Sequence, residues 1–252
     1  MAKKIALNFL YIAVVIGIVL GVWAIGAAVA DSEFVLPDIG TTFAKLGEVF
    51  TTSDFWSGLG WTMLRCVISY AISVAVAGAA FFVCSISQIV SRIVRPIISA
   101  LRTLPTMALS ILFAIWAGAT VAPVILGVLV IMPMLFSALW AKTVTVPKEL
   151  IETARLFGAG RVRVFTCATL PYAASALPES LATAFSFGIK IIIAAEIIMQ
   201  TANSFGMLMS ISYTYLKTAK LIAYVLIAVV LSVVSEYVIR AVLFFGLKRF
   251  CD

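Results

Sequence analysis

The sequence predicts an all-α polytopic membrane protein with six transmembrane helices and a cytoplasmic N-terminus. Of its 252 residues, 63% are hydrophobic and only 12% are charged, and the mean hydropathy is +1.18. A water-soluble core cannot bury this much apolar surface, so a bilayer is the expected solvent. Apolar runs of about 20 residues cross the hydrocarbon as helices, because the backbone has no water to bond with there.

Stretches without charged residues give most of the expected spans. The run at residues 5–30 is longer than the core of a cleaved signal peptide, which has ~7–15 residues, so we expect a retained anchor helix. The run at 103–141 is too long for one helix, and Gly118 and Pro123 break it into two spans joined by a tight outside turn near 116–120. The other three expected spans lie within 66–91, at about 181–199 and at about 221–245.

The distribution of basic residues predicts the orientation of these spans, because lysine and arginine gather in the cytoplasmic segments of membrane proteins. With the N-terminus inside, only Lys45, Lys217 and Lys220 fall outside. The cytoplasmic side then holds Lys3, Lys4, Arg92, Arg95, Arg102, Lys142, Lys148, Arg155, Arg161, Arg163, Lys248 and Arg249, with Arg240 close to it.

The predicted outer loop, residues 31–61, is rich in acidic side chains. Its opening at Pro37 and Asp38 is typical of a helix start. Apolar residues then recur at helical spacing, which predicts a short amphipathic helix on the membrane surface. These apolar residues are Phe43, Leu46, Val49 and Phe50.

Composition disfavours several function classes. Lys and Arg outnumber Asp and Glu by 18 to 11, but they form short clusters between apolar runs, so we expect no nucleic-acid partner. The absence of histidine removes the commonest general base and zinc ligand. The cysteines show no C-x-x-C spacing, so we predict no disulfide framework and no metal site. Without a histidine base, we also predict no catalytic residues. The cysteines are Cys66, Cys84, Cys167 and Cys251.

The longest predicted cytoplasmic segment, residues 142–171, has more structure than a simple tether. Pro147 and the acidic residues after it indicate a helix start. Gly158 and Gly160 then supply a turn where the backbone approaches another surface closely. A second short helix with one apolar and one basic face follows, and Pro171 is expected to end it. We interpret this helix-turn-helix as a docking element.

This segment resembles the EAA loop of binding-protein-dependent ABC importer permeases, whose pattern is E-A-A, three residues, G, nine residues, I-x-L-P. Thr153 replaces the second-position alanine and Ala168 replaces the isoleucine. Both replacements are small, so the short helix and its docking face are retained. The matching positions are Glu152, Ala154, Gly158, Leu170 and Pro171.

Further matches resemble the nitrate, sulfonate and taurine permease family, which also serves thiamin-precursor and related small organic substrates. They cover most of the chain and flank the EAA loop on both sides. They are the segments 36–37, 62–65, 95–96, 101–105, 116–118 and 194–196.

The resemblance implies one transmembrane permease domain over residues 1–252, with the type I importer fold, in the bacterial inner membrane. It implies a homodimer with two cytosolic ATPase subunits and an outside binding protein that delivers a small, anionic or sulfonate-like substrate. The EAA loop would sit in a cleft of the ATPase, whose ATP-driven closure rocks the spans. The chain has no G-x-x-x-x-G-K-[ST], so we expect ATP and Mg²⁺ on the partner and no cofactor in this chain.

Two ionisable side chains fall inside the fifth span. A charge near the bilayer centre costs about 2.5–3.5 kcal/mol on insertion scales, so Lys190 and Glu196 should face protein or water. Their separation corresponds to roughly 240° around a helix, so they do not form a stacked pair. Two alternatives stay open: they line a translocation path, or they tie the span to its neighbours. At the start of the third span, Pro105, Thr106 and Met107 either shape the path or begin an ordinary helix.

Three other charged residues are expected to be structural. Arg65, at the outer start of the second span, is expected to extend to the interface or to bond neighbouring carbonyl groups. Glu236 and Arg240 are spaced as an i,i+4 pair on the sixth span.

A stand-alone ion-coupled secondary transporter, with Lys190 and Glu196 as a relay, is the alternative function. The chain shows no convincing internal repeat, and its cytosolic loop is elaborate, so we favour the importer subunit. An intramembrane enzyme would need a nucleophile and base, and no such pair is indicated. We therefore predict a non-catalytic subunit embedded in membrane lipid.

Overall fold

The computed structural model describes residues 2–143, 145–174 and 177–251, with side chains at 11, 14–143, 145–174 and 177–244. Val144 of the predicted cytoplasmic loop and the side chains of Lys3, Lys4, Lys248, Arg249 and Cys251 lie outside the described residues. In the described part every regular element is helical, which confirms the all-α class. The elements are α1 (Ala2–Ala30), α2 (Ile39–Phe50), α3 (Ser53–Ile86), α4 (Gln88–Leu101), α5 (Thr106–Thr143), α6 (Lys148–Leu156), α7 (Arg161–Val164), the π-helix η1 (Phe165–Thr169), α8 (Leu170–Ala174), α9 (Leu177–Met199), α10 (Phe205–Thr214) and α11 (Thr218–Cys251).

Four helices of the described residues are long and apolar enough to cross a membrane. The described apolar part of α1, Val14–Ala30, is shorter. These helices confirm a multi-pass helical fold, while the six-span count and the N-terminal orientation stay predictions. The four helical segments are Ser53–Ile86, Thr106–Thr143, Leu177–Met199 and Thr218–Phe244.

The chain forms two compact units. Unit 1 comprises residues 1–57 and 208–227, and unit 2 comprises residues 58–207 and 228–252. The single permease domain over 1–252 stays a prediction.

In unit 1, α2 is the short amphipathic helix that the sequence predicts within residues 31–61. Asp38 caps it, since its carboxylate accepts a 2.8 Å hydrogen bond from the Thr41 amide and a 2.7 Å bond from the Thr41 hydroxyl. These two bonds lower the pKa of Asp38 below its usual value. Trp23 of α1 donates its indole N–H to the carbonyl of Pro37 at 3.0 Å, which ties the turn to the end of α1.

The predicted boundary of the second span is wrong, because α3 begins at Ser53 rather than near Cys66. The residues assigned to the end of the outer loop are therefore the first turns of this helix. Phe55 in the first turn is fully buried, and its ring packs edge-on against Phe50 at 5.3 Å. The search for charge-free runs missed this start because Asp54 and Arg65 interrupt the hydropathy.

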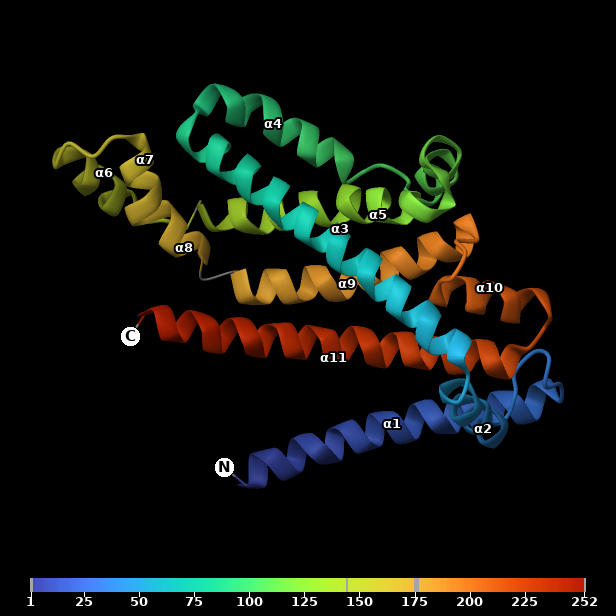
Figure 1. Cartoon of the computed structure of the whole chain (residues 1–252). Helices are drawn as coiled ribbons and strands as arrows, with labels where there is room; N and C mark the ends of the chain where they lie inside the picture. The colour runs from blue at the N-terminus through green and yellow to red at the C-terminus, as the bar shows by residue number, and fades with distance from the viewer. Residues whose placement is uncertain (1, 144, 175–176, 252) are drawn as a thin grey trace. The chain divides into compact units, whose positions relative to one another are not determined.

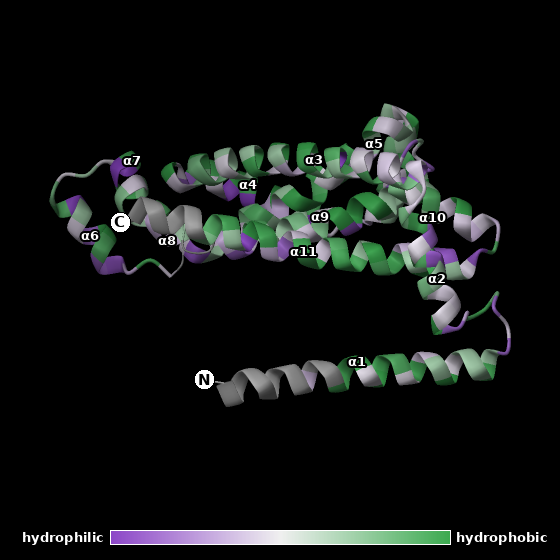
Figure 2. Cartoon of the chain, turned by 60° about the horizontal axis from the view of Figure 1, so that its bottom comes forward, coloured by the Kyte–Doolittle hydropathy of each residue, from purple (hydrophilic) through white to green (hydrophobic). Residues whose placement is uncertain are grey.

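In unit 2, α5 and α9 lie side by side and form the centre of the core (Figure 1). Ile131 and Leu135 of α5 are buried in one cluster with Ala184 of α9. Figure 2 shows green, hydrophobic residues along these long helices and more purple, hydrophilic ones at α6 and α7. A helix satisfies its own backbone hydrogen bonds, so the long helices can carry apolar side chains on surfaces suited to lipid.

The predicted break at Gly118 is confirmed. This residue has φ 76° and ψ 152°, a non-helical conformation inside α5, and glycine adopts it without steric cost. Pro123, also expected to break the run, lies within the helix after the break. A proline cannot bond the carbonyl four residues earlier. Here the Thr201 hydroxyl donates to that carbonyl, on Ala119, at 2.8 Å.

The segment that carries Arg92, Arg95 and Arg102 contains a helix that the sequence analysis does not predict. This helix, α4, begins after Ser87, whose hydroxyl accepts a 3.4 Å bond from the amide of residue 90. Ile98 is buried in the same cluster as α3 and α5 side chains. The segment is therefore packed against the long helices of unit 2 rather than being a plain connection.

At one end of unit 2, α6 and α7 form the helix-turn-helix that the sequence predicts (Figure 1). The first helix follows Pro147 as expected. The expected stop at Pro171 is wrong, since η1 and α8 continue the second helix to Ala174. The Leu170 amide bonds the Phe165 carbonyl five residues earlier, and this wider π turn accommodates the proline that follows.

Candidate functional site

The segment from α6 to α7 has one unpacked helix and one anchored helix. No residue of α6 is buried. Its predicted motif residues Glu152 and Gly158 are exposed, and Ala154 is partly exposed. An amphipathic helix whose apolar face is only partly covered gains little from packing within its own chain. Its position therefore favours a surface that another molecule covers.

Two large apolar residues of this segment were missed by the sequence analysis. Leu156, the last residue of α6, and Phe157 are each 86% exposed. They are adjacent and precede the turn at Gly158. A pair of adjacent bulky apolar residues among the charged residues of this segment was the available signal, since exposed apolar patches mark interaction sites.

Gly158 closes α6 in the left-handed conformation, with φ 75°. Its amide bonds the Arg155 carbonyl at 2.9 Å, and the Ala159 amide bonds the Ala154 carbonyl at 3.0 Å. This is the usual way in which a glycine after a helix satisfies the last carbonyls. The glycine is thus required by the backbone of the turn.

The second half of the segment is anchored to the core. Val164, Phe165 and Ala168 are buried. The ring of Phe165 lies 5.2 Å from that of Phe82 and 5.7 Å from that of Phe81, both on α3. The motif residues Leu170 and Pro171 remain exposed beyond this anchor. Packed aromatic rings therefore join the second half of the segment to α3.

Inside unit 2, Glu196 of α9 is fully buried and paired with Arg65 of α3, which is only 6% exposed. Arg65 donates from Nη1 to the Glu196 carboxylate at 3.0 Å and from Nη2 to the Ala202 carbonyl at 3.4 Å. The Thr62 hydroxyl also donates to the carboxylate, 2.8 Å from its nearer oxygen. The alternative that Arg65 extends to the interface is wrong, because a buried carboxylate holds it inside, and the alternative that it bonds a neighbouring carbonyl group is confirmed.

The chain after α9 folds back over Glu196 and completes its bonding. The Gly206 amide donates to the carboxylate at 3.2 Å, and the Phe205 amide donates to the Thr62 hydroxyl at 2.9 Å. A side chain at Gly206 would lie 2.8 Å from the carbonyl of Ile193, so only glycine permits this approach. These contacts favour the alternative in which Glu196 ties α9 to its neighbours.

The two ionisable residues of α9 have opposite surroundings. Lys190 is exposed, although many residues of α9 are buried. Within the described part of the chain it forms no salt bridge. Lys190 and Glu196 do not pair with each other in the structure. Their angular separation around the helix predicted this result. A role on a translocation path stays a prediction for both residues.

The other singled-out residues have simple local positions. Pro105 directly precedes α5, and its carbonyl accepts the Leu109 amide at 3.1 Å. Thr106 begins the helix, and Met107 is exposed. Glu236 and Arg240 form the predicted i,i+4 pair, 3.0 Å apart.

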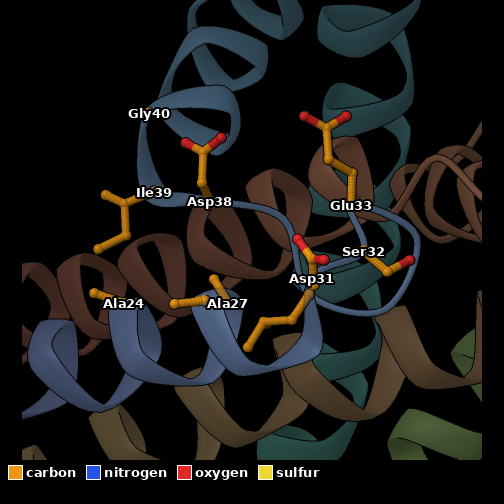
Figure 3. Close-up of a pocket in the computed structure, with 10 residues that line it drawn as sticks. Ala24, Ala27, Asp31, Ser32, Glu33, Asp38, Ile39 and Gly40 are labelled. Carbon is orange, nitrogen blue, oxygen red and sulfur yellow. The ribbon is translucent and has the colours of Figure 1, made fainter.

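Unit 1 contains a pocket of about 500 Å³ between the end of α1 and the start of α2. Figure 3 shows that the carboxylates of Asp31, Glu33 and Asp38 surround it. The Asp38 carboxylate is already bonded to the first turn of α2. Among the described residues no group of three or more acidic or cysteine side chains could hold a metal ion. The pocket is therefore a solvated acidic surface.

Three comparisons with known proteins agree with one another. Residues 69–243 match the family model described as "Binding-protein-dependent transport system inner membrane component". The chain is similar to the taurine transport system permease protein TauC of Escherichia coli (strain K12), with 24% identity over 226 residues, 87% of this chain and 82% of the relative. It also resembles a chain in the crystal structure of an amino acid ABC transporter with histidines, with a TM-score of 0.64 and 18% identity, covering 81% and 97% of the two chains.

The structural likeness, at this identity, shows a shared fold. The family match covers more than half of the chain and includes the α6–α7 segment and all of α9. The chain therefore belongs to the binding-protein-dependent transport system inner membrane components, the permeases of ABC importers, and is a multi-pass protein of the inner membrane.

Proposed function

We propose that this permease couples to a cytosolic ATPase through the α6–α7 segment and carries a small anionic or sulfonate-like substrate. One observation supports the coupling role most strongly. α6 buries no residue within this chain, while Leu156 and Phe157 project beside it. An apolar pair in a cleft of the ATPase would gain the burial that it lacks here.

Permeases of this family work with an ATPase and a substrate-binding protein in general. The finer arrangement that we propose has two permease copies, two ATPase subunits that bind ATP and Mg²⁺, and an outside binding protein. Closure of the ATPase pair would move α6, and the Phe165 contacts with α3 would pass that movement to the long helices. This chain supplies the path and no hydrolytic chemistry.

The anionic substrate class has two supports. The relative TauC is named for taurine transport, and taurine carries a sulfonate group. Lys190 is an exposed cation on a long apolar helix, and its charge would be favourable only beside water, protein or an anion. We propose that Lys190, with Pro105, Thr106 and Met107, lines the path, and that Glu196 shapes it by holding α3 against α9.

We further propose six crossings with the N-terminus inside, in which the third crossing is a broken helix. α4 has 14 residues, or about 21 Å at about 1.5 Å per residue, which is shorter than the ~30 Å hydrocarbon layer. The part of α5 before Gly118 is shorter still, about 18 Å. In succession the two pieces are long enough for one crossing, with its break at residues 102–105. Broken helices occur where irregular backbone lines a cavity.

The coupling proposal is tested by purifying the tagged full chain from its native host in mild detergent. Mass spectrometry should find a P-loop ATPase at about one copy per permease. Phe157→Asp should abolish this recovery, because a charge cannot occupy an apolar cleft. The matched control is Tyr213→Asp, an exposed aromatic residue on α10. Recovery of the chain alone, or equal recovery for both variants, would contradict the proposal.

A further inference from the structure

A second cationic site lies in unit 2, away from Lys190. A pocket of about 540 Å³ lies between α4 and the C-terminal part of α5. Arg92, Arg95 and Arg102 all line it. Arg92 and Arg95 lie on α4, and Arg102 follows its last residue in a helical conformation, so their spacing of three and seven residues places them on one side. The pocket is thus lined by three arginines from one short segment of the chain.

Side chains of α5 complete the pocket and orient two of the arginines. The Arg95 guanidinium lies over the Trp140 ring, 4.8 Å from its centre. Arg102 donates from Nη1 to the Ser137 hydroxyl at 3.3 Å. Stacking on the aromatic face restricts Arg95 without neutralising its charge. Each of the two arginines therefore keeps donors available in a fixed direction.

Among the described residues, no acidic side chain forms a salt bridge with these three arginines. The residues that line the pocket include no aspartate and no glutamate. The salt bridges of the described residues join Lys45 with Glu48, Arg65 with Glu196, and Arg240 with Glu236. The three pocket arginines take part in none of them. All three arginines are exposed and line one pocket, so a bound anion would be attracted to all three positive charges.

The pocket is not at the outermost tip of the helices. Ser137 precedes the end of α5 at Thr143 by roughly 9 Å along the helix, at about 1.5 Å per residue. Beside the arginines, α4 exposes a second, apolar stripe formed by Ile89, Ile93 and Ile97. A charged face and an apolar face on one short helix are suited to the boundary between lipid and water.

We propose that this pocket binds a compact oxyanion, a sulfate, sulfonate or phosphate group. Guanidinium groups match such groups with paired N–H donors. Two sources carry this chemistry: a free small anion in the aqueous phase, or the phosphate of an anionic phospholipid whose chains lie along the isoleucine stripe. The site extends the proposed function, but its binding does not require transport.

The first measurement uses the unmodified full chain in two arms. In the free-anion arm, the chain in phosphatidylcholine nanodiscs is dialysed against radiolabelled sulfate, with chloride holding the ionic strength constant. In the lipid arm, native mass spectrometry compares phosphatidylglycerol with phosphatidylcholine adducts in detergent. We expect saturable binding of one stoichiometric ligand in at least one arm. Failure of both probes to bind would overturn the proposal.

The second measurement locates the bound probe. Arg102→Gln and Arg95→Gln should each weaken binding of the active probe at least tenfold, while Arg240→Gln, whose partner Glu236 is elsewhere in unit 2, should change it less than twofold. On unmodified protein, the bound probe should protect Arg92, Arg95 and Arg102 from phenylglyoxal but leave Arg240 reactive. This protection does not depend on any variant folding.

The proposed site would be overturned if the pocket variants and the control variant lost binding equally. It would also be overturned if the bound probe protected Arg240 as much as the pocket arginines. These outcomes are separate from the proposed function. A chain that recovers its ATPase but binds neither probe retains the coupling role and loses this pocket.

Discussion

Two regions of unit 2 differ in how fully their side chains are bonded or buried within the chain. Around Glu196 every strong group has a partner inside the chain: Arg65, Thr62 and the Gly206 amide surround one carboxylate. No residue of α6 is buried, and Leu156 and Phe157 are 86% exposed. The polar groups of the first region are bonded within one chain, while the apolar residues of the second are left uncovered.

The difference separates structural residues from interaction residues better than residue type does. A charge inside a membrane helix is a functional candidate by default, yet Glu196 has the surroundings of a structural tie. A loop leucine and phenylalanine look unremarkable in a sequence, yet their exposure marks a contact surface. Variants in the first region should therefore change stability, and those in the second region should change coupling.

The largest expected effect comes from Glu196→Ala. Removing the carboxylate leaves Arg65 buried without a counter-charge, which typically costs about 3–5 kcal/mol. We expect a large fall in the melting temperature of the detergent-solubilised chain, measured by light scattering and fluorescence. The control, Glu236→Ala, breaks a partly exposed pair and should cost less than about 1 kcal/mol.

A double variant, Arg65→Met with Glu196→Met, sharpens this result. It removes both charges and keeps apolar volume, so it should recover much of the lost stability. A single Glu196 variant as stable as the Glu236 control would show that the cluster is not the structural tie described here.

The next effect concerns coupling. Gly158→Val forces a β-branched residue to φ 75°, which it rarely adopts, so the turn that ends α6 should shift. We expect ATP-dependent uptake by the reconstituted complex to fall at least tenfold. Gly160→Val is the matched control, since Gly160 has φ −67° and open space at its Cβ position. Equal uptake by the two variants would contradict the role of the turn.

A smaller effect is expected at the Pro123 kink. Thr201→Val removes the hydroxyl that bonds the Ala119 carbonyl and leaves a partly buried acceptor unpaired, at a cost of about 1 kcal/mol. In a Pro123→Ala background the amide at position 123 can donate to the Ala119 carbonyl, so Thr201→Val should cost less stability. Thermal unfolding of the four variants measures this coupling, and purely additive effects would argue against it.

The smallest effect lies in unit 1, at the cap of α2. The pKa of Asp38 is lowered by the bonds from Thr41. Its stabilising contribution is therefore present above the unfolded pKa of about 3.9 and is lost as pH falls through the folded value. Hydrogen exchange should show lower protection of the Thr41 amide near pH 3 than at pH 7. Asp38→Asn, which keeps an acceptor without titrating, should show no such change.

Much of the fold is predictable from local patterns. α2, α6 and the break at Gly118 follow from capping residues, helical spacing and glycine, all of which lie within a few positions of the element that they define. α9 and α11 follow from long apolar runs. The EAA spacing likewise predicts a role for the α6–α7 segment without any knowledge of its packing.

The missed features depend on tertiary structure. Arg65 and Glu196 are 131 positions apart, so no local pattern pairs them. α4 was overlooked because its arginines interrupt the hydropathy on which the span search relied, although their spacing is helical. The prediction that Pro171 ends a helix is wrong because a π turn precedes it. Residue preferences alone do not indicate such a turn.

The central claim, that the α6–α7 segment meets the ATPase, is tested most directly by photo-crosslinking in intact cells. A photoreactive amino acid is placed at position 157, and a second chain carries it at position 213 as the control. The account predicts a crosslink to a P-loop ATPase from position 157 and none from position 213. No ATPase crosslink from position 157, with the chain folded and in the membrane, would contradict it.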